Sequence, residues 1–266
     1  MTVAVTGAAG MLGQDVVRAA GEDVVAYSRA DLDVTDAGAV REALAGVELA
    51  INCAAWTGVD DAEQHEAEAL AVNRDGARNV AAAARRVIYV STDYVFDGSK
   101  RSPYVESDPT GPLQSYGRTK LAGERATAGA NPRHHIVRSS WLFGAGGPNF
   151  VETMLRVGSQ RDELRVVADQ VGCPTFTGHL AEGLVRLAES EDYGVHHLAG
   201  GGACSWYEFA REIFARSSVD CEVEPITTEE YPLPARRPAW SVLGSERGST
   251  LAPWQEGLEA YLGVRA

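Results

Sequence analysis

The sequence lacks the features that mark disulfide-rich, zinc-binding or membrane proteins. Its four cysteines, Cys53, Cys173, Cys204 and Cys221, are widely spaced and form no C-x-x-C pair. A disulfide scaffold or a zinc site is therefore not expected, and buried thiols are the simplest interpretation. No segment reaches 18 consecutive apolar residues, and no charged region precedes an apolar stretch at the N-terminus. We therefore expect a cytoplasmic protein without a membrane partner.

Basic residues are also scarce. Lysine and arginine number 24 against 37 aspartates and glutamates, which gives a net charge of −13. A nucleic-acid partner is not expected, because phosphate backbones attract basic patches. A phosphorylated small molecule stays possible, since it needs only a few local donors. The 266 residues, with 45% hydrophobic content, fit one large α/β domain or one domain with a small lobe.

The first half of the chain alternates short β-rich runs with helical segments. This alternation predicts a parallel sheet with helices on both faces, that is, a doubly wound α/β fold. The predicted strands are residues 3–6, 23–27, 49–53, 87–91 and 135–138, and the predicted helices are residues 11–20, 37–44, 62–84 (as one or two pieces) and 114–126.

The pattern changes near residue 145. Ser205 and Glu208 have capping-box spacing at the start of a helix. We expect a sheet domain at residues 1–147 and a smaller lobe at 148–266, interleaved with the first, and enzymes of this layout often bind substrate between two such parts. In this second part the predicted helices are 150–158, 178–190, 205–216 and 255–262, the predicted strands are 164–167 and 195–198, and a structured loop covers the proline-rich residues 225–238.

Three glycines, Gly7, Gly10 and Gly13, form a G-x-x-G-x-x-G pattern between the first strand and the first helix. Glycine permits a tight turn there and lets backbone N–H groups approach a pyrophosphate at the helix N-terminus. The plainer alternative is a tight turn without a ligand. The position after the first strand, at the start of a βαβ unit, favours a dinucleotide site.

The end of the second strand bears on the choice of dinucleotide. It reads Ala-Tyr-Ser-Arg and ends without an acid that would bind a ribose 2′-hydroxyl. Ser28 and Arg29 can hold a 2′-phosphate, which favours NADPH, although Arg29 can equally be a solvated surface residue. Asp31 and Asp33 follow closely, so NADH stays open.

Thr92, Tyr116 and Lys120 form a candidate proton-transfer group. Tyr116 and Lys120 lie four residues apart in a predicted helix and therefore share one face. A free tyrosine has a pKa of ~10, which a nearby ammonium lowers. Thr92 ends a predicted strand, where ligands of open parallel sheets bind. A Y-x-x-x-K pair occurs by chance on many helices, but together with the glycine turn it predicts a nicotinamide-dependent carbonyl reductase.

Five sequence runs occur in the order seen in one known family. They are residues 6–13, 91–98, 116–120, 138–141 and 169–175, of which Ser-Thr-Asp-Tyr-Val-Phe-Asp-Gly at 91–98 is the most specific. Together they resemble the dTDP-4-dehydrorhamnose reductases, extended short-chain dehydrogenases/reductases. The resemblance runs nearly end to end and implies a Rossmann-type doubly wound parallel sheet with a smaller C-terminal α/β substrate-binding lobe.

The resemblance also implies an activity and a set of roles. The activity is that of an oxidoreductase of nucleotide-sugar biosynthesis, which reduces dTDP-4-dehydro-6-deoxy-L-mannose at C4 to dTDP-L-rhamnose. Thr92, Tyr116 and Lys120 are then the catalytic residues, and Tyr116 and Lys120 also face the cofactor. Asp93 and Trp141 contact the sugar and Arg237 approaches the pyrophosphate, with core packing as the alternative for Trp141 and a surface role for Arg237. The cofactor is lined by Gly10, Met11, Leu12, Asp33, Val34, Ala54, Ala55 and Trp56.

The chain departs from the family in one place, because the stretch from Asn73 to Ser91 is several residues short, around residues 84–86. Some family members use magnesium at a dimer interface, but no carboxylate cluster here matches that site, so no metal ligand is assigned and a monomer and a homodimer both stay open. Two other functions also stay open. One is a 4-ketoreductase for another dTDP-deoxysugar, and the other is a non-catalytic nucleotide-binding regulatory subunit of the same fold.

Overall fold

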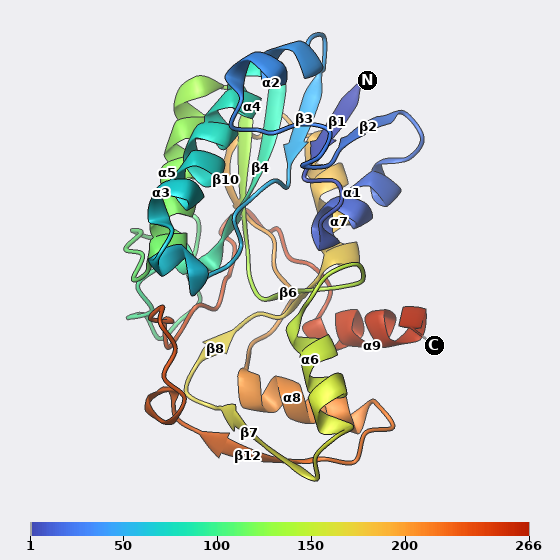
Figure 1. The fold of residues 1–266 in the computed structure, drawn as a ribbon, viewed down its shortest axis with the longest axis vertical. Coiled ribbons are helices and arrows are strands. Elements are labelled where there is room, and N and C mark those ends of the chain that lie inside the picture. The colour runs from blue at the N-terminus through green and yellow to red at the C-terminus, as the bar shows by residue number, and fades with distance from the viewer. Residues whose placement is uncertain (1, 266) are drawn as a thin grey trace.

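The computed structural model describes residues 2–265, and its largest feature is a parallel sheet of six strands (Figure 1). The strands lie in the order β10-β5-β4-β3-β1-β2, and each neighbouring pair is parallel. This arrangement confirms the predicted doubly wound α/β fold. The strands are β1 (Val3–Thr6), β2 (Val24–Tyr27), β3 (Leu49–Asn52), β4 (Arg86–Thr92), β5 (His134–Ser139) and β10 (Gly194–His197).

Helices cover both faces of this sheet (Figure 1). On one face α1 (Met11–Ala20) packs against α7 (Thr177–Ala188), and their apolar side chains form a core with β1, β3 and β4. The other face carries α2 (Ala37–Ala43), α3 (Glu66–Leu70), α4 (Ala77–Ala83) and α5 (Ser115–Ala130). Residues 2–265 include no helix long and apolar enough to cross a membrane.

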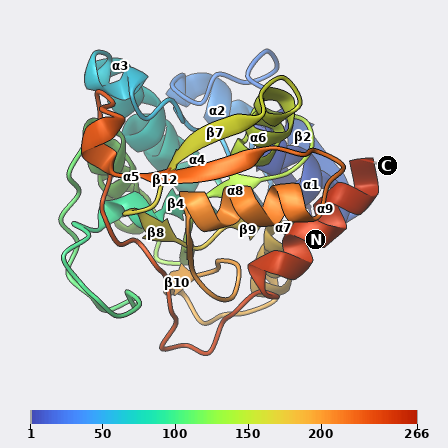
Figure 2. The same cartoon turned by 90° about the horizontal axis from the view of Figure 1, so that it is seen from below.

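A smaller lobe lies beyond the carboxyl ends of the strands, and Figure 2 shows β7 and β12 running beside α8. Its core is aromatic and includes Phe143, Phe209 and Tyr261. The lobe contains the helices α6 (Phe150–Gly158), α8 (Trp206–Ala215) and α9 (Trp254–Arg265), and the short strand pairs β6 (Leu142–Phe143) with β9 (Thr175–Phe176), β7 (Glu163–Val167) with β12 (Glu222–Ile226), and β8 (Val171–Gly172) with β11 (Cys204–Ser205).

The second half of the chain contributes to both the small lobe and the large sheet. After building part of the lobe it returns with α7 and β10, and β10 pairs with β5 at the edge of the large sheet. The predicted capping box is present, since Ser205 and Glu208 bond reciprocally at the start of α8.

Two predicted elements were wrong in part. Residues 225–226 belong to β12 rather than to a loop, and Thr228–Glu230 forms a short 3-10 turn. Proline at position 225 is tolerated because β12 lies in a two-stranded sheet, where one side of the strand needs no ladder bonds. The predicted helix at 62–84 is broken into a 3-10 turn (Asp61–Glu63), α3, a π-helical segment (Ala71–Gly76) and α4. A π-helical segment often marks a functional site.

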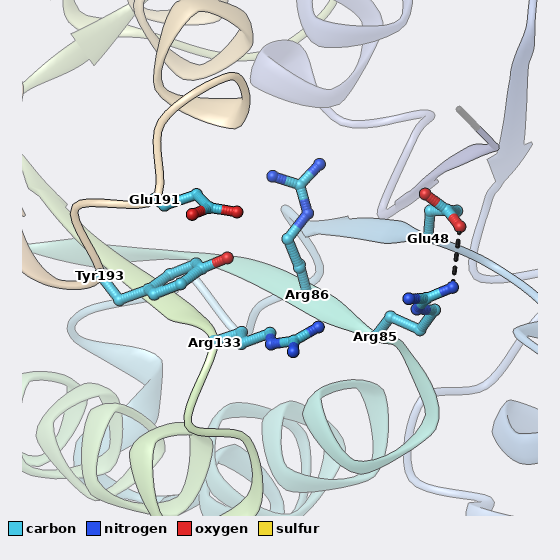
Figure 3. Close-up of a pocket in the computed structure, with 6 residues that line it drawn as sticks. All are labelled: Glu48, Arg85, Arg86, Arg133, Glu191 and Tyr193. Atoms are coloured by element: carbon cyan, nitrogen blue, oxygen red, sulfur yellow. Dashed lines mark hydrogen bonds and ion pairs between the residues drawn. The ribbon is translucent and has the colours of Figure 1, made fainter.

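The shortened stretch lies at the start of β4, the end of that strand opposite Thr92. Only residues 84 and 85 connect α4 to β4, and a pocket forms there (Figure 3). Arg85 pairs with Glu48 at 3.1 Å, and Arg86 donates to the carbonyl of Ala188, the last residue of α7, at 2.9 Å. Arginine at a helix C-terminus complements the negative end of the helix dipole, so these side chains have a structural role. The lining residues are Glu48, Arg85, Arg86, Arg133, Glu191 and Tyr193.

Candidate active site

The glycine turn leaves no room for side chains. Gly7 has a φ of +71°, and a Cβ atom on it would lie 2.6 Å from the amide nitrogen of Ala54. A Cβ on Gly13 would collide with the carbonyl oxygen of Gly7. Gly10 is the N-cap of α1. It has no side chain that could accept hydrogen bonds from the backbone N–H groups of the first turn. This cradle of backbone donors suits a pyrophosphate.

Residues 54–56 lie beside this turn and are held by two buried asparagines. Asn52 Oδ1 accepts from the hydroxyl of Thr6 at 2.8 Å and from the backbone N–H of Ala54 at 3.0 Å. Asn73, in the π-helical segment, accepts from the backbone N–H of Trp56 at 2.8 Å and donates to its carbonyl oxygen. The sequence prediction missed Asn73 as a site residue, although a polar amide in the middle of an alanine-rich helix is a signal.

The end of β2 presents an exposed Arg29. Its neighbour Ser28 is already bonded to Asp31, whose carboxylate accepts from the Ser28 hydroxyl at 2.6 Å. The pKa of Asp33 is lowered mainly by hydrogen bonds from Thr35, with a smaller contribution from the charge of Arg29. Arg29 is therefore exposed and positively charged, as a contact with a cofactor 2′-phosphate requires. That contact stays a prediction. Val34 is buried and packs against Gly76 of the π-helical segment.

Thr92, Tyr116 and Lys120 are brought together between β4 and α5. The hydroxyls of Thr92 and Tyr116 are hydrogen-bonded. Lys120 is only 2% exposed, and its ammonium donates to the carbonyl oxygen of Val90 at 2.6 Å and lies 4.1 Å from the ring centre of Tyr89. Burial lowers the pKa of Lys120 to about 7, and the charge of Glu124 partly opposes this.

Tyr116 differs from the prediction in one respect. We expected Lys120 to lower its pKa, but burial and the charge of Asp93 raise the pKa of Tyr116 above its ordinary value, while the bond with Thr92 acts in the opposite direction. The phenol is therefore protonated at neutral pH. That is the form needed to give a proton to a carbonyl oxygen during reduction.

Asp93 is the centre of a buried polar cluster beside Tyr116. Its side chain is 2% exposed and accepts from the hydroxyl of Thr92 at 3.1 Å, from that of Ser140 at 3.0 Å, and from Ser241. Burial raises the pKa of Asp93 to about 6 despite these bonds. The sequence did not reveal Ser140 and Ser241, because they come from other parts of the chain.

Trp141 has an unusual backbone for a large side chain, with a φ of 46°. Its indole ring stacks on Trp206 with 3.4 Å between ring centres and 6° between planes. A Cβ on Gly172 would lie 2.5 Å from the ring, so this glycine is needed for the packing. The Trp141 ring nitrogen is buried and donates to no protein group in residues 2–265. Strained residues and unpartnered donors cluster at ligand sites, which favours a binding role beside the packing role.

Arg237 is partly buried, since 13% of its side chain is exposed. Its guanidinium pairs with both carboxylate oxygens of Asp60, donates to the Ala235 carbonyl oxygen at 2.7 Å and hydrogen-bonds the Tyr94 hydroxyl. The Tyr94 ring meets Tyr116 edge-on at 6.4 Å. Arg237 therefore links the C-terminal segment to the loop after β3 and lies close to the catalytic group.

Two curated relatives match most of the chain. The "dTDP-4-dehydrorhamnose reductase" of Streptomyces griseus is 45% identical over 91% of this chain and 85% of its own length. The "dTDP-4-keto-6-deoxy-D-glucose reductase" of Streptomyces niveus is 44% identical over 91% of this chain and 88% of its own length.

A solved structure and a family model agree with these matches. The dTDP-4-dehydrorhamnose reductase of Bacillus anthracis, solved in complex with NADP, superposes with a TM-score of 0.94 and is 36% identical over 99% of both chains. The family model described as the RmlD substrate binding domain matches residues 1–265. The chain therefore belongs to the RmlD substrate binding domain family, which confirms the resemblance found in its motifs.

Proposed function

We propose that the protein reduces the C4 ketone of a dTDP-4-keto-6-deoxyhexose with NADPH, and that its substrate is dTDP-4-dehydrorhamnose and its product dTDP-L-rhamnose. One observation carries this proposal: the protonated phenol of the half-buried Tyr116 is hydrogen-bonded to Thr92 and lies on the same helix as the buried Lys120, at the end of the sheet that also bears the glycine turn. The names of the relatives supply the sugar.

The site residues have separate proposed roles in binding and in proton transfer. The backbone N–H groups at the start of α1 hold the pyrophosphate of the cofactor, where glycine leaves space for it. The bound nicotinamide supplies the hydride. Tyr116 gives its hydroxyl proton to the ketone oxygen, Thr92 orients that oxygen, and Lys120 holds the cofactor ribose. Proton transfer is favourable because an alkoxide is a stronger base than a phenolate, even one with a raised pKa.

NADPH is the proposed donor because Arg29 is exposed and positively charged at the end of β2, where a 2′-phosphate binds in folds of this kind. A related solved structure contains NADP. Asp93 and Trp141 are proposed to contact the sugar, and Arg237 the pyrophosphate once it exchanges Asp60 for a phosphate oxygen.

A second candidate is a 4-ketoreductase that makes another dTDP-deoxysugar. The Streptomyces niveus protein, named for a different ketosugar, matches this chain about as closely as the rhamnose enzymes do. A regulatory subunit is a weaker candidate, because it has no need for the Thr92–Tyr116 bond or for a buried Lys120.

The test is to follow NADPH and NADH oxidation with dTDP-4-ketosugars made in situ. We expect turnover with dTDP-4-dehydrorhamnose and a preference for NADPH. Tyr116→Phe should abolish turnover and keep NADPH binding, since it removes only the hydroxyl. Preferred turnover of another ketosugar would select the second candidate. Tight NADPH binding without turnover of any ketosugar would favour the regulatory subunit, and normal turnover by Tyr116→Phe would exclude the proposed mechanism.

A further inference from the structure

A buried carboxylate one turn after Lys120 connects the two elements that carry the catalytic residues. Glu124 of α5 is 3% exposed. It accepts a hydrogen bond of 2.6 Å from the hydroxyl of Ser91 in β4. It also accepts two bonds, of 2.9 and 2.8 Å, from the guanidinium of Arg138 in β5.

The chain positions of these partners matter. Ser91 directly precedes Thr92, and Glu124 lies on the same helix as Tyr116 and Lys120. Ser91 is also in register with Arg138 in the sheet. The three side chains therefore fix the end of β4 to α5, immediately beside the Thr92–Tyr116 hydrogen bond.

A buried ion pair contributes little to stability on balance, because desolvation offsets the attraction between the charges. A two-pronged arginine contact has a narrow geometry, however, so it orients the carboxylate well. Arg138 thereby holds Glu124 in the position from which it accepts the Ser91 hydroxyl.

We propose that Glu124 is a positioning residue, which clamps the end of β4 to α5 through Ser91 and so sets the distance between Thr92 and Tyr116. This proposal rests on the proposed function, since it concerns the same proton transfer. Glu124 has a second effect, because its charge supports the ammonium of Lys120 in a buried environment.

Ser91→Ala removes the clamp and leaves the Glu124–Arg138 pair intact. We expect kcat to fall about 10-fold while KM for NADPH changes less than about twofold, since small misplacements of reacting groups affect the chemical step more than binding. Ser139→Ala is the matched control. Ser139 is in register with Thr92 on β5, and its buried hydroxyl bonds no group within residues 2–265, so kcat should keep its wild-type value.

The charge of Glu124 is tested separately. Glu124→Gln alone leaves Arg138 buried without a counter-charge and endangers folding. The double variant Glu124→Gln with Arg138→Met removes both charges and keeps similar volumes. As pH rises, its kcat/KM should fall at a lower pH than that of wild type, because the charge of Glu124, and not that of Arg138, contributes to the pKa of Lys120. Ser91→Ala keeps the charge of Glu124 and should leave the pH profile unchanged. If the role of Glu124 were purely structural, neither Ser91→Ala nor the double variant would shift the pH profile.

The outcomes separate the two proposals. An active wild type in which Ser91→Ala matches Ser139→Ala refutes the clamp and leaves the proposed function standing. An unmoved pH profile in the folded double variant refutes the electrostatic effect. A wild type that turns over no dTDP-4-ketosugar refutes the proposed function and the clamp together.

Discussion

Replacing Asp93 with asparagine should stabilise the protein at alkaline pH. Asp93 is buried, and its pKa is raised from 3.8 to about 6. Ionisation of this carboxyl group therefore destabilises the folded protein. The proposed reason for keeping Asp93 here is its contact with the sugar. Asparagine has the same shape and no charge, and the hydroxyls of Thr92, Ser140 and Ser241 can still bond to it because a hydroxyl both donates and accepts.

The magnitude follows from linkage. In the unfolded chain Asp93 ionises near its ordinary pKa of 3.8, and in the folded protein only near 6. As pH rises from 4 to 6 the unfolded state thus loses its proton first, and the free energy of unfolding of the wild type falls. A shift of two units corresponds to about 3 kcal/mol. Asp93→Asn should gain up to this amount relative to wild type at pH 8 and only a small part of it at pH 4, where the unfolded chain has just begun to ionise.

Urea unfolding at pH 4, 6 and 8 measures the difference. Asp97→Asn is the matched control, because Asp97 also accepts several bonds, from Ser99 and Tyr104, but these lower its pKa. Its loss should destabilise the protein at pH 8 and matter less as pH falls. The reasoning is refuted if Asp93→Asn is less stable than wild type at pH 8, or if its difference from wild type does not change with pH.

Other substitutions probe the binding residues. Gly13→Ala places a methyl group against Gly7 and should lower the free energy of unfolding by about 1–3 kcal/mol and weaken NADPH binding, measured by fluorescence titration. Arg29→Ala should raise KM for NADPH about 10-fold, the worth of one charged hydrogen bond, and leave KM for NADH in place; equal effects on both would exclude a phosphate contact. Trp206→Ala should weaken binding of the dTDP-ketosugar by about 0.5–1.5 kcal/mol, because it unstacks Trp141. An unchanged KM for the sugar would limit Trp141 to core packing.

The sequence was sufficient for those parts of the site that depend on local structure. The three glycines required a tight turn between β1 and α1, and Tyr116 and Lys120 shared a face because they lie on one helix. The boundaries of most predicted elements were correct within about two residues, since hydrophobic periodicity and capping residues act locally.

Contacts between distant segments had no local signal. The Asp60–Arg237 pair and the Asp93–Ser241 bond join residues far apart in the chain, so the sequence alone revealed neither contact. The pKa of Tyr116 was mispredicted for the same reason. A charge on the same helix is visible in the sequence, but the burial that dominates this pKa depends on the fold as a whole.

The two ends of strand β4 differ in how their polar groups are satisfied. At the end shown in Figure 3, Arg85 and Arg86 are exposed or matched to a carboxylate and a helix end, and their interactions are those expected of a stable surface. At the opposite end burial shifts the pKa values of Asp93 and Lys120 in the direction that disfavours their charged forms, and Trp141 has a strained backbone. Folding alone gains nothing from such features, and their concentration around Tyr116 is the physical reason for locating proton transfer there.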